Sequence, residues 1–219
     1  MFSDRIKVEY DVYTTSYKAL KALNNLPDTI ALDFETRSQW SNAEIREAKD
    51  LLKTDELSHE DRILCKLVAN SSGLSFPAIT KITHVNIAWA KDKALVIVVS
   101  SPKMEQVILG WIVNTNRHFI FWNHGFDGKI IYQKTGKFVQ SYDDGQLLAK
   151  CYLNHCDNWK AKVGLKDLMG EYYQKEWCLI DSYSDEDLKK ESFLRYSAID
   201  AAATFYGWEI LQTMGESNE

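Results

Sequence analysis

The stretch Thr29–Trp40, "TIALDFETRSQW", places two carboxylates at the end of an apolar run. Over its first eight residues the run has the composition of a strand that is buried on both faces. Side chains two residues apart in a strand point to the same face, so Asp33 and Glu35 share one face while Phe34 points to the other. By itself this pattern leaves two interpretations open, an exposed strand end or one half of a metal site.

The segments on either side of this stretch predict an α/β fold. Because strands and helices mix along the chain, we expect a mixed sheet with helices on both faces. Ligands in such folds collect at strand ends and the loops that follow them. The expected strands cover 6–13, 29–36, a hairpin over 82–100 with its turn at 90–93, and 118–124. The expected helices cover 14–26 (capped by Thr14 or Thr15), two within 41–70, then 102–115, 125–136, 142–155, 164–174 and 185–214.

Length and composition are those of one globular domain over residues 1–219. The chain has 219 residues and is 45% hydrophobic, enough for a sizeable core. Since no apolar run approaches the ~20 residues of a membrane helix and the N-terminus lacks a signal-peptide core, we expect a cytoplasmic protein. The four cysteines form no CxxC pair, and reduced thiols are expected. Cys151, His155 and Cys156 are a weak zinc candidate; a buried helix face is the preferred explanation.

The net charge of −5 argues against a protein that coats duplex nucleic acid non-specifically. One segment has the opposite balance, because residues 128–166 contain seven lysines and three aspartates. These lysines are at positions 129, 134, 137, 150, 160, 162 and 166. They are either an ordinary solvated surface or a basic rim beside an acidic site.

Two further stretches carry acids that chemistry could use. In "WNHGFDGKI", Asp127 lies just after a strand end, where a helix starts. In "LRYSAIDAAATF", Tyr196 and Asp200 are four residues apart and therefore neighbours on one helix face. The small apolar residues around that pair predict a closely packed helix, in which a buried Asp needs a partner.

Each of these pieces has an ordinary explanation when taken alone, such as a helix cap for Asp127 or one side-chain hydrogen bond between Tyr196 and Asp200. Together they suggest one centre. Four converging carboxylates repel one another unless divalent cations lie between them, and Mg²⁺ or Mn²⁺ prefers carboxylate and water ligands.

In chain order, "DFET", "NHGFD" and "YSAID" resemble the three motifs DxE, NxxxD and YxxxD of the DEDD exonucleases. The tyrosine marks the DEDDy subgroup, within the ribonuclease H-like superfamily. The lead-in to "DFET" and the helices around "YDDGQLLAKCYLN" and "GLKDLMGEYY" resemble the proofreading domain of family A DNA polymerases. The resemblance covers nearly the whole chain. One departure is an insertion over residues 38–81, expected to be helical, which could roof or flank the site.

The resemblance implies a 3′–5′ exonuclease, a phosphodiester hydrolase that uses two Mg²⁺ or Mn²⁺ ions. Asp33 would bridge both ions, Glu35 and Asp200 would complete the first site, and Asp127 would support the second. Tyr196 would orient the attacking water, since a phenol with a pKa near 10 is a poor base.

Substrate contacts are expected from residues beside the acids, because a single-stranded 3′ end is held by stacking and backbone contacts. The candidates are Phe34, Thr36, Asn123 and Phe126. Trp40 has two interpretations, burial under the insertion or stacking on a base. The lysine-rich segment would meet the incoming backbone.

The preferred function is hydrolysis of single-stranded DNA 3′ ends to nucleoside 5′-monophosphates, in proofreading, replication or repair. The enzyme would be freestanding or a module beside a DNA polymerase or another replication protein. One alternative is a ribonuclease D-like 3′–5′ exoribonuclease. An alternative of another class is a non-catalytic docking scaffold for a replication protein.

Overall fold

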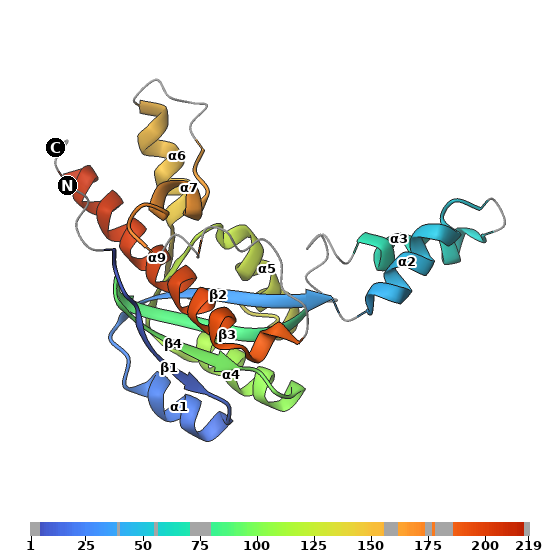
Figure 1. Ribbon diagram of the computed structural model, residues 1–219, viewed down its shortest axis with the longest axis horizontal. Helices are drawn as coiled ribbons and strands as arrows, with labels where there is room; N and C mark the ends of the chain where they lie inside the picture. The colour runs from blue at the N-terminus through green and yellow to red at the C-terminus, as the bar shows by residue number, and fades with distance from the viewer. Residues whose placement is uncertain are drawn as a thin grey trace.

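The computed structural model describes residues 5–38, 40–54, 57–70, 80–155, 162–173, 177 and 186–216. Within them the chain forms a six-stranded mixed sheet with helices on both faces (Figure 1). The strands are β1 (Glu9–Tyr13), β2 (Thr29–Ser38), β3 (Thr80–Ala90), β4 (Lys93–Val98), β5 (His118–Phe121) and β6 (Tyr142–Asp144), in the spatial order β1-β4-β3-β2-β5-β6. This architecture confirms the predicted fold class.

The strand β2 lies inside the sheet, antiparallel to β3 and parallel to β5. The predicted hairpin is confirmed, because β3 and β4 pair antiparallel across a two-residue turn at 91–92. The outer strands β1 and β6 pair parallel with β4 and β5.

One prediction in this region is wrong, since residues 142–144 form the edge strand β6 rather than the start of a helix. The free edge of β5 offers backbone partners to this short segment, and a sheet edge of that kind overrides local helix propensity.

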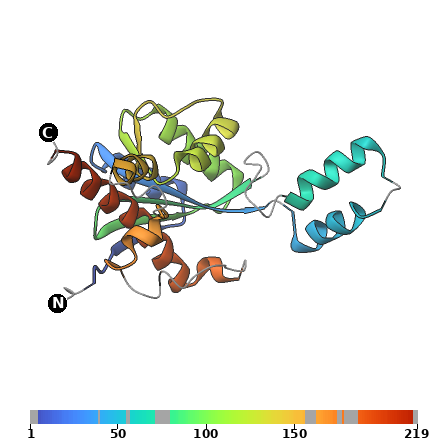
Figure 2. The ribbon, with the colours of Figure 1, turned by 90° about the horizontal axis from the view of Figure 1, so that it is seen from above.

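The helices form two layers (Figure 2). On one face lie α1 (Ser16–Asn24), α4 (Pro102–Asn114) and α5 (His124–Thr135); α9 (Glu191–Glu216) crosses the other face beside α6 (Gly145–His155) and α7 (Leu165–Met169). A 3₁₀ turn, Asp187–Lys189, precedes α9. Thr15 is the N-cap residue of α1, although its side chain makes no capping hydrogen bond. Gly136 ends α5 in the left-handed conformation, as the sequence predicts.

The alternation along β2 divides the core in two. Ile30, Leu32 and Phe34 pack into a large apolar cluster with α1, α4 and α5. Ala31 points the other way, into a cluster in which alanines of α9 approach the sheet closely. Full burial of a Leu, Ile or Phe side chain contributes about 1.5–3 kcal/mol, so the register of β2 is strongly fixed. A fixed register in turn fixes the face on which Asp33 and Glu35 lie.

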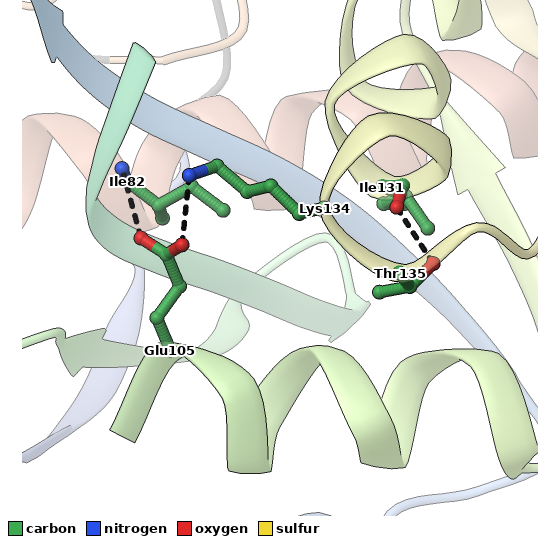
Figure 3. A network of polar contacts seen from close by, with 5 residues as sticks. All are labelled: Ile82, Glu105, Ile131, Lys134 and Thr135. Carbon is green, nitrogen blue, oxygen red and sulfur yellow. Dashed lines mark hydrogen bonds and ion pairs between the residues drawn. The ribbon is translucent and has the colours of Figure 1, made fainter. Parts of the chain in front are cut away.

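A buried polar contact joins α5 to α4 and the sheet (Figure 3). The carboxylate of Glu105 accepts hydrogen bonds from Lys134 Nζ, at 2.8 Å, and from the Ile82 backbone N–H, at 3.4 Å. The side chains of Lys134 and Glu105 are only 19% and 15% exposed. Lys134 therefore belongs to the interior, which fits neither the solvated surface nor the basic rim that the sequence left open for it.

The insertion contains the two expected helices, α2 (Asn42–Leu51) and α3 (His59–Asn70). They lie side by side and project beyond the ends of β2 and β3, away from α5 and α9 in both views (Figures 1 and 2). A small separate cluster holds them together, made of Ile45, Ala48, Val68 and Ala69 with Trp40 against it. Trp40 is thus packed under the insertion, and the described helices flank the body rather than roof the acids.

The described helices include none that is both long and apolar enough to cross a membrane. Cys151 is exposed on α6, so the preferred explanation of a buried helix face is wrong for this cysteine. The other two members of the zinc candidate, the His155 side chain and Cys156, lie outside the described residues.

Candidate active site

Three of the predicted acids meet at one point above the sheet. Asp33 and Glu35 come from the α9-facing side of β2, and Asp200 comes from the middle of α9. One carboxylate oxygen from each of the three lies within 4.8 Å of the others. Immediately after Glu35 the pairing of β2 with β3 shifts register, so an irregularity of the strand lies directly after the acids.

Asp127 approaches the same centre from the other layer. It lies in the first turn of α5 and is 3% exposed. Its carboxylate accepts a hydrogen bond from the backbone N–H of Phe34, at 3.2 Å. Phe34 lies between Asp33 and Glu35 in β2, so the Asp127 carboxylate contacts the strand at the two acids. The sequence predicted this convergence, although Asp127 lies outside the group of three acids whose oxygens are mutually close.

The turn before α5 depends on Asp144, a residue that sequence reasoning missed. Asn123 has φ 71° and ψ 60°, a left-handed conformation that Asn tolerates better than most residues. The Asp144 carboxylate at the end of β6 accepts hydrogen bonds from the N–H groups of Asn123, at 3.1 Å, and His124, at 3.0 Å. It also accepts from Gln146 N–H at the start of α6. An Asp directly before a helix is a cap signal that the sequence does contain.

Two neutral donors hold the acids in place. The side-chain amide of Asn86, on β3, donates to Asp33 Oδ2 at 3.0 Å. The indole N–H of Trp177 donates to Asp200 Oδ1 at 2.9 Å. Both donor side chains are buried, Asn86 fully and Trp177 at 1% exposure. A lone Asn in the apolar run of β3 is a recognisable signal, because a buried amide needs partners; for Trp177 no such signal exists.

Burial raises the pKa of all four acids, and repulsion between carboxylates raises it further for Glu35, Asp127 and Asp200. Burial is the larger cause in each case. Repulsion from Asp33 adds to it for Glu35 and Asp127, whose pKa values are raised well above their usual range. For Asp200, burial and then Asp33 raise the pKa to about 7. The site therefore binds protons near neutral pH unless cations compensate the carboxylates.

Tyr196 lies beside Asp200, as their spacing on α9 predicts. Burial, followed by the charges of Asp200 and Glu35, raises the pKa of the Tyr196 phenol above its usual 10. Its hydroxyl therefore stays protonated at neutral pH and interacts with the Asp200 carboxylate. Such a phenol orients a neighbouring group and does not act as a base.

His84 is a further residue that sequence reasoning missed. It pairs with Glu35 across β2 and β3 and is 1% exposed, with its ring 4.9 Å from that of Phe193. Burial lowers the pKa of His84 to about 4, so its ring is neutral at physiological pH. It fills space next to the acids without adding charge.

The predicted substrate contacts fare differently. Phe34 is 4% exposed and packs in the apolar cluster on the α1, α4 and α5 face, so its ring offers no surface for a base and that prediction is wrong. Phe126 is half-buried against the same cluster. Thr36 is half-buried and Asn123 exposed.

The lysines of residues 128–166 differ in exposure, and those that are exposed fit both the solvated surface and the basic rim. Lys129, Lys137, Lys150 and Lys162 are exposed, and Lys160 lies outside the described residues. Lys166 differs from these, because it is half-buried on α7 with its ammonium 4.7 Å from the centre of the Tyr196 ring.

The donor set fits a hard divalent cation. Three carboxylates within 4.8 Å of one another, with Asp200 buried and Asp33 and Glu35 half-buried, are costly without compensation, and oxygen ligands of this kind suit Mg²⁺ or Mn²⁺. Nothing in the cluster offers the sulfur ligands that favour zinc or copper(I).

This chain is similar to known proteins in its fold, without a match at the level of sequence families. No protein-family model and no curated protein sequence matches it. Among solved structures, the Mg²⁺-bound NrnC of Brucella melitensis matches with a TM-score of 0.54 and 16% identity, over 97% of this chain and 84% of that one. Escherichia coli RNase D, an exoribonuclease, matches with a TM-score of 0.55 and 13% identity, over 96% of this chain and 46% of that one. Trypanosoma brucei RNase D in complex with RNA U12 matches with a TM-score of 0.54 and 15% identity, over 94% of this chain and 63% of that one. The chain therefore has the ribonuclease H-like fold that these nucleases share.

Proposed function

We propose that this protein is a divalent-metal-dependent 3′–5′ exonuclease that hydrolyses the 3′ ends of single-stranded nucleic acid to nucleoside 5′-monophosphates. The observation that carries the proposal is the meeting of Asp33, Glu35 and Asp200 within 4.8 Å, on a fold that known exonucleases share. The order of the three sequence motifs supports the same reaction.

In this proposal each residue has a distinct task. Asp33, Glu35 and Asp200 would hold the divalent ions, and Asp127 would support them from α5. Bound Mg²⁺ or Mn²⁺ would supply the acidity that activates a water and the positive charge that stabilises the leaving oxygen. Tyr196 donates its proton in a hydrogen bond that orients the attacking water.

Hydrogen bonds from two buried donors hold the carboxylates in this arrangement. Asn86 and Trp177 fix the direction of the Asp33 and Asp200 carboxylates before any ion arrives. Groups of this kind limit the reorganisation that the reaction requires.

Two substrate classes remain, and each has its own support. The sequence resemblance to polymerase proofreading domains favours DNA, with a role in replication or repair beside a polymerase. A solved structure of the same fold holds the RNA U12, which favours RNA. The site's backbone-directed chemistry accommodates both, so the choice depends on contacts to the ribose.

The test is degradation of 5′-labelled single-stranded DNA, single-stranded RNA and mismatched duplex DNA, with Mg²⁺ or Mn²⁺ and with EDTA. We expect a ladder that shortens from the 3′ end, is lost in EDTA and is lost in Asp33→Ala and Asp200→Ala. Asp11→Ala is the matched control, because Asp11 is an exposed acid on β1. Activity that persists in Asp33→Ala would overturn the site; folded but inactive wild type would favour the docking scaffold.

A further inference from the structure

The side chain of Lys166 approaches the acid cluster from a different element than any of the acids. It lies on the short helix α7, which packs on α9, and its ammonium lies 4.7 Å from the centre of the Tyr196 ring. A cation over an aromatic face is attracted by the ring's electrons, so Tyr196 holds the lysine in a defined place.

The same ammonium acts electrostatically on two of the acids. Its positive charge lowers the pKa of Glu35 and of Asp200, against the larger effect of burial. The geometry places the ammonium near these acids, because it lies 4.7 Å from the centre of the Tyr196 ring, and Tyr196 is one helical turn from Asp200 on α9. Lys166 is therefore a neighbour of the catalytic carboxylates, unlike the exposed lysines of the segment 129–162.

In the proposed reaction the negative charges of the site and substrate exceed the positive charges of two divalent ions. Asp33, Glu35, Asp127 and Asp200 carry four negative charges when ionised, which two divalent ions balance. The phosphodiester of the substrate adds one negative charge, and attack by a water-derived oxygen adds more. A lysine beside the cluster supplies positive charge without a further ion.

We propose that Lys166 is a substrate-binding residue of this site, whose ammonium contacts a non-bridging oxygen of the scissile phosphate. The inference rests on the proposed exonuclease function. In the metal-free protein the ammonium is drawn to the carboxylates; once ions occupy them, the phosphate becomes its stronger partner. A flexible four-carbon stem allows this small change of partner.

A purely structural role for Lys166 predicts something different. If the ammonium only compensated the acids, its removal would disturb the cluster and weaken metal binding, with no separate effect on phosphate. If it contacts phosphate, Lys166→Met has effects of opposite sign. Metal binds as tightly or more tightly, because a competing cation is gone, while the phosphate loses a charged partner.

The experiment measures binding without turnover. Titration calorimetry in Mg²⁺ gives the Kd of a nucleoside 5′-monophosphate, the proposed product, and of the matching uncharged nucleoside; a metal titration gives the Kd of Mg²⁺. For Lys166→Met we expect the monophosphate to bind about tenfold more weakly, as for a lost charge-assisted hydrogen bond. Nucleoside binding and Mg²⁺ binding should not weaken. Lys166→Arg should recover part of the affinity.

The matched control is Lys103→Met, an exposed lysine on α4 at the other face of the sheet, which should change each Kd by less than about twofold. Thermal unfolding checks that each variant is folded, and Lys166→Gln replaces the methionine variant if that one is not. Unchanged monophosphate affinity in the folded variant, or equally weakened Mg²⁺ binding, would overturn the proposal.

Degradation of DNA and RNA by wild type is measured alongside the binding experiments. Wild type that degrades neither contradicts the exonuclease function, whereas active wild type with an unchanged Lys166→Met contradicts the role of the lysine alone.

Discussion

The side-chain amide of Asn86 donates a hydrogen bond to the carboxylate of Asp33 over 3.0 Å, and so joins β3 to β2 at the centre of the acid cluster. Asn86 is fully buried, and this bond lowers the pKa of Asp33 against the dominant effect of burial. The amide thereby favours the ionised, metal-binding form of the carboxyl group.

Replacement of Asn86 should therefore weaken metal binding. We expect Asn86→Ala to raise the Mg²⁺ concentration for half-maximal activity by about tenfold, in the range found for groups that orient metal ligands. Activity measured across a Mg²⁺ series checks this. Asn114→Ala, at an exposed position on α4, is the control and should not move the midpoint. If the Mg²⁺ concentration for half-maximal activity is unchanged in Asn86→Ala, Asn86 does not position Asp33 for metal binding.

The hydrogen bond from Trp177 to Asp200 makes a similar prediction for a second carboxylate. Trp177→Phe keeps an aromatic ring but loses the N–H donor, which costs about 1.5–3 kcal/mol for a bond to a charged group. Catalysis should fall by about tenfold or more, with the pH at which activity rises shifted upward. Trp111→Phe is the comparison, since that indole bonds to Asn24 far from the acids. Equal pH profiles for the two variants would contradict the link.

Metal-free protein should become less stable as the pH rises through neutrality. The pKa of Asp200 is raised to about 7 by burial and by Asp33, so the folded state holds a proton there that the unfolded chain has released. This contribution is fully present below the ordinary Asp pKa and is lost as the pH rises through about 7. In EDTA, denaturant unfolding of wild type should give about 1 kcal/mol more stability near pH 6 than near pH 8 from this group.

Asp200→Asn provides the control for that measurement. It cannot titrate, so its stability should change less between the same two pH values, and it should exceed wild type in stability at the higher one. A wild-type pH dependence equal to that of Asp200→Asn would contradict the raised pKa. Mg²⁺ should stabilise wild type far more than the variant, because ligand that binds only the folded state stabilises it.

The ion pair between Lys134 and Glu105 should matter to stability and not to chemistry. Both side chains are mostly buried, and removal of one partner leaves the other charge uncompensated. We expect Lys134→Met to lower the free energy of unfolding by about 3 kcal/mol. Lys53→Met breaks the exposed pair with Asp50 and should cost less than about 1 kcal/mol. Denaturant melts of the two variants decide it; similar values would show that the buried pair contributes little.

The arm formed by α2 and α3 should unfold independently of the body. Its own cluster is small, and short helices rely on such packing. Val68→Asp places a charge in that cluster and should expose the backbone amides of residues 42–70 to hydrogen exchange, with protection of β2 and α9 unchanged. Lost protection in β2 would show that arm and body unfold together. Val12→Asp, at an exposed position on β1, is the control.

The sequence by itself determined much of the site. Alternation along β2 put Asp33 and Glu35 on one face, and helical spacing put Tyr196 next to Asp200, because both periodicities are local properties of the backbone. The motif order was enough to expect that Asp127 joins them. These inferences needed no knowledge of which elements pack together.

Tertiary structure alone decided what surrounds the acids. Three residues around the acids come from different parts of the chain: Asn86 from β3, Lys166 from α7, and Trp177 from the segment between α7 and α9. Their meeting depends on how these parts pack together. Packing also explains why two candidate substrate contacts are not available to a substrate: Phe34 is buried in the apolar core, and Lys134 forms an ion pair with Glu105. A local pattern records the direction of a side chain, whereas its partner depends on which elements the buried core brings together.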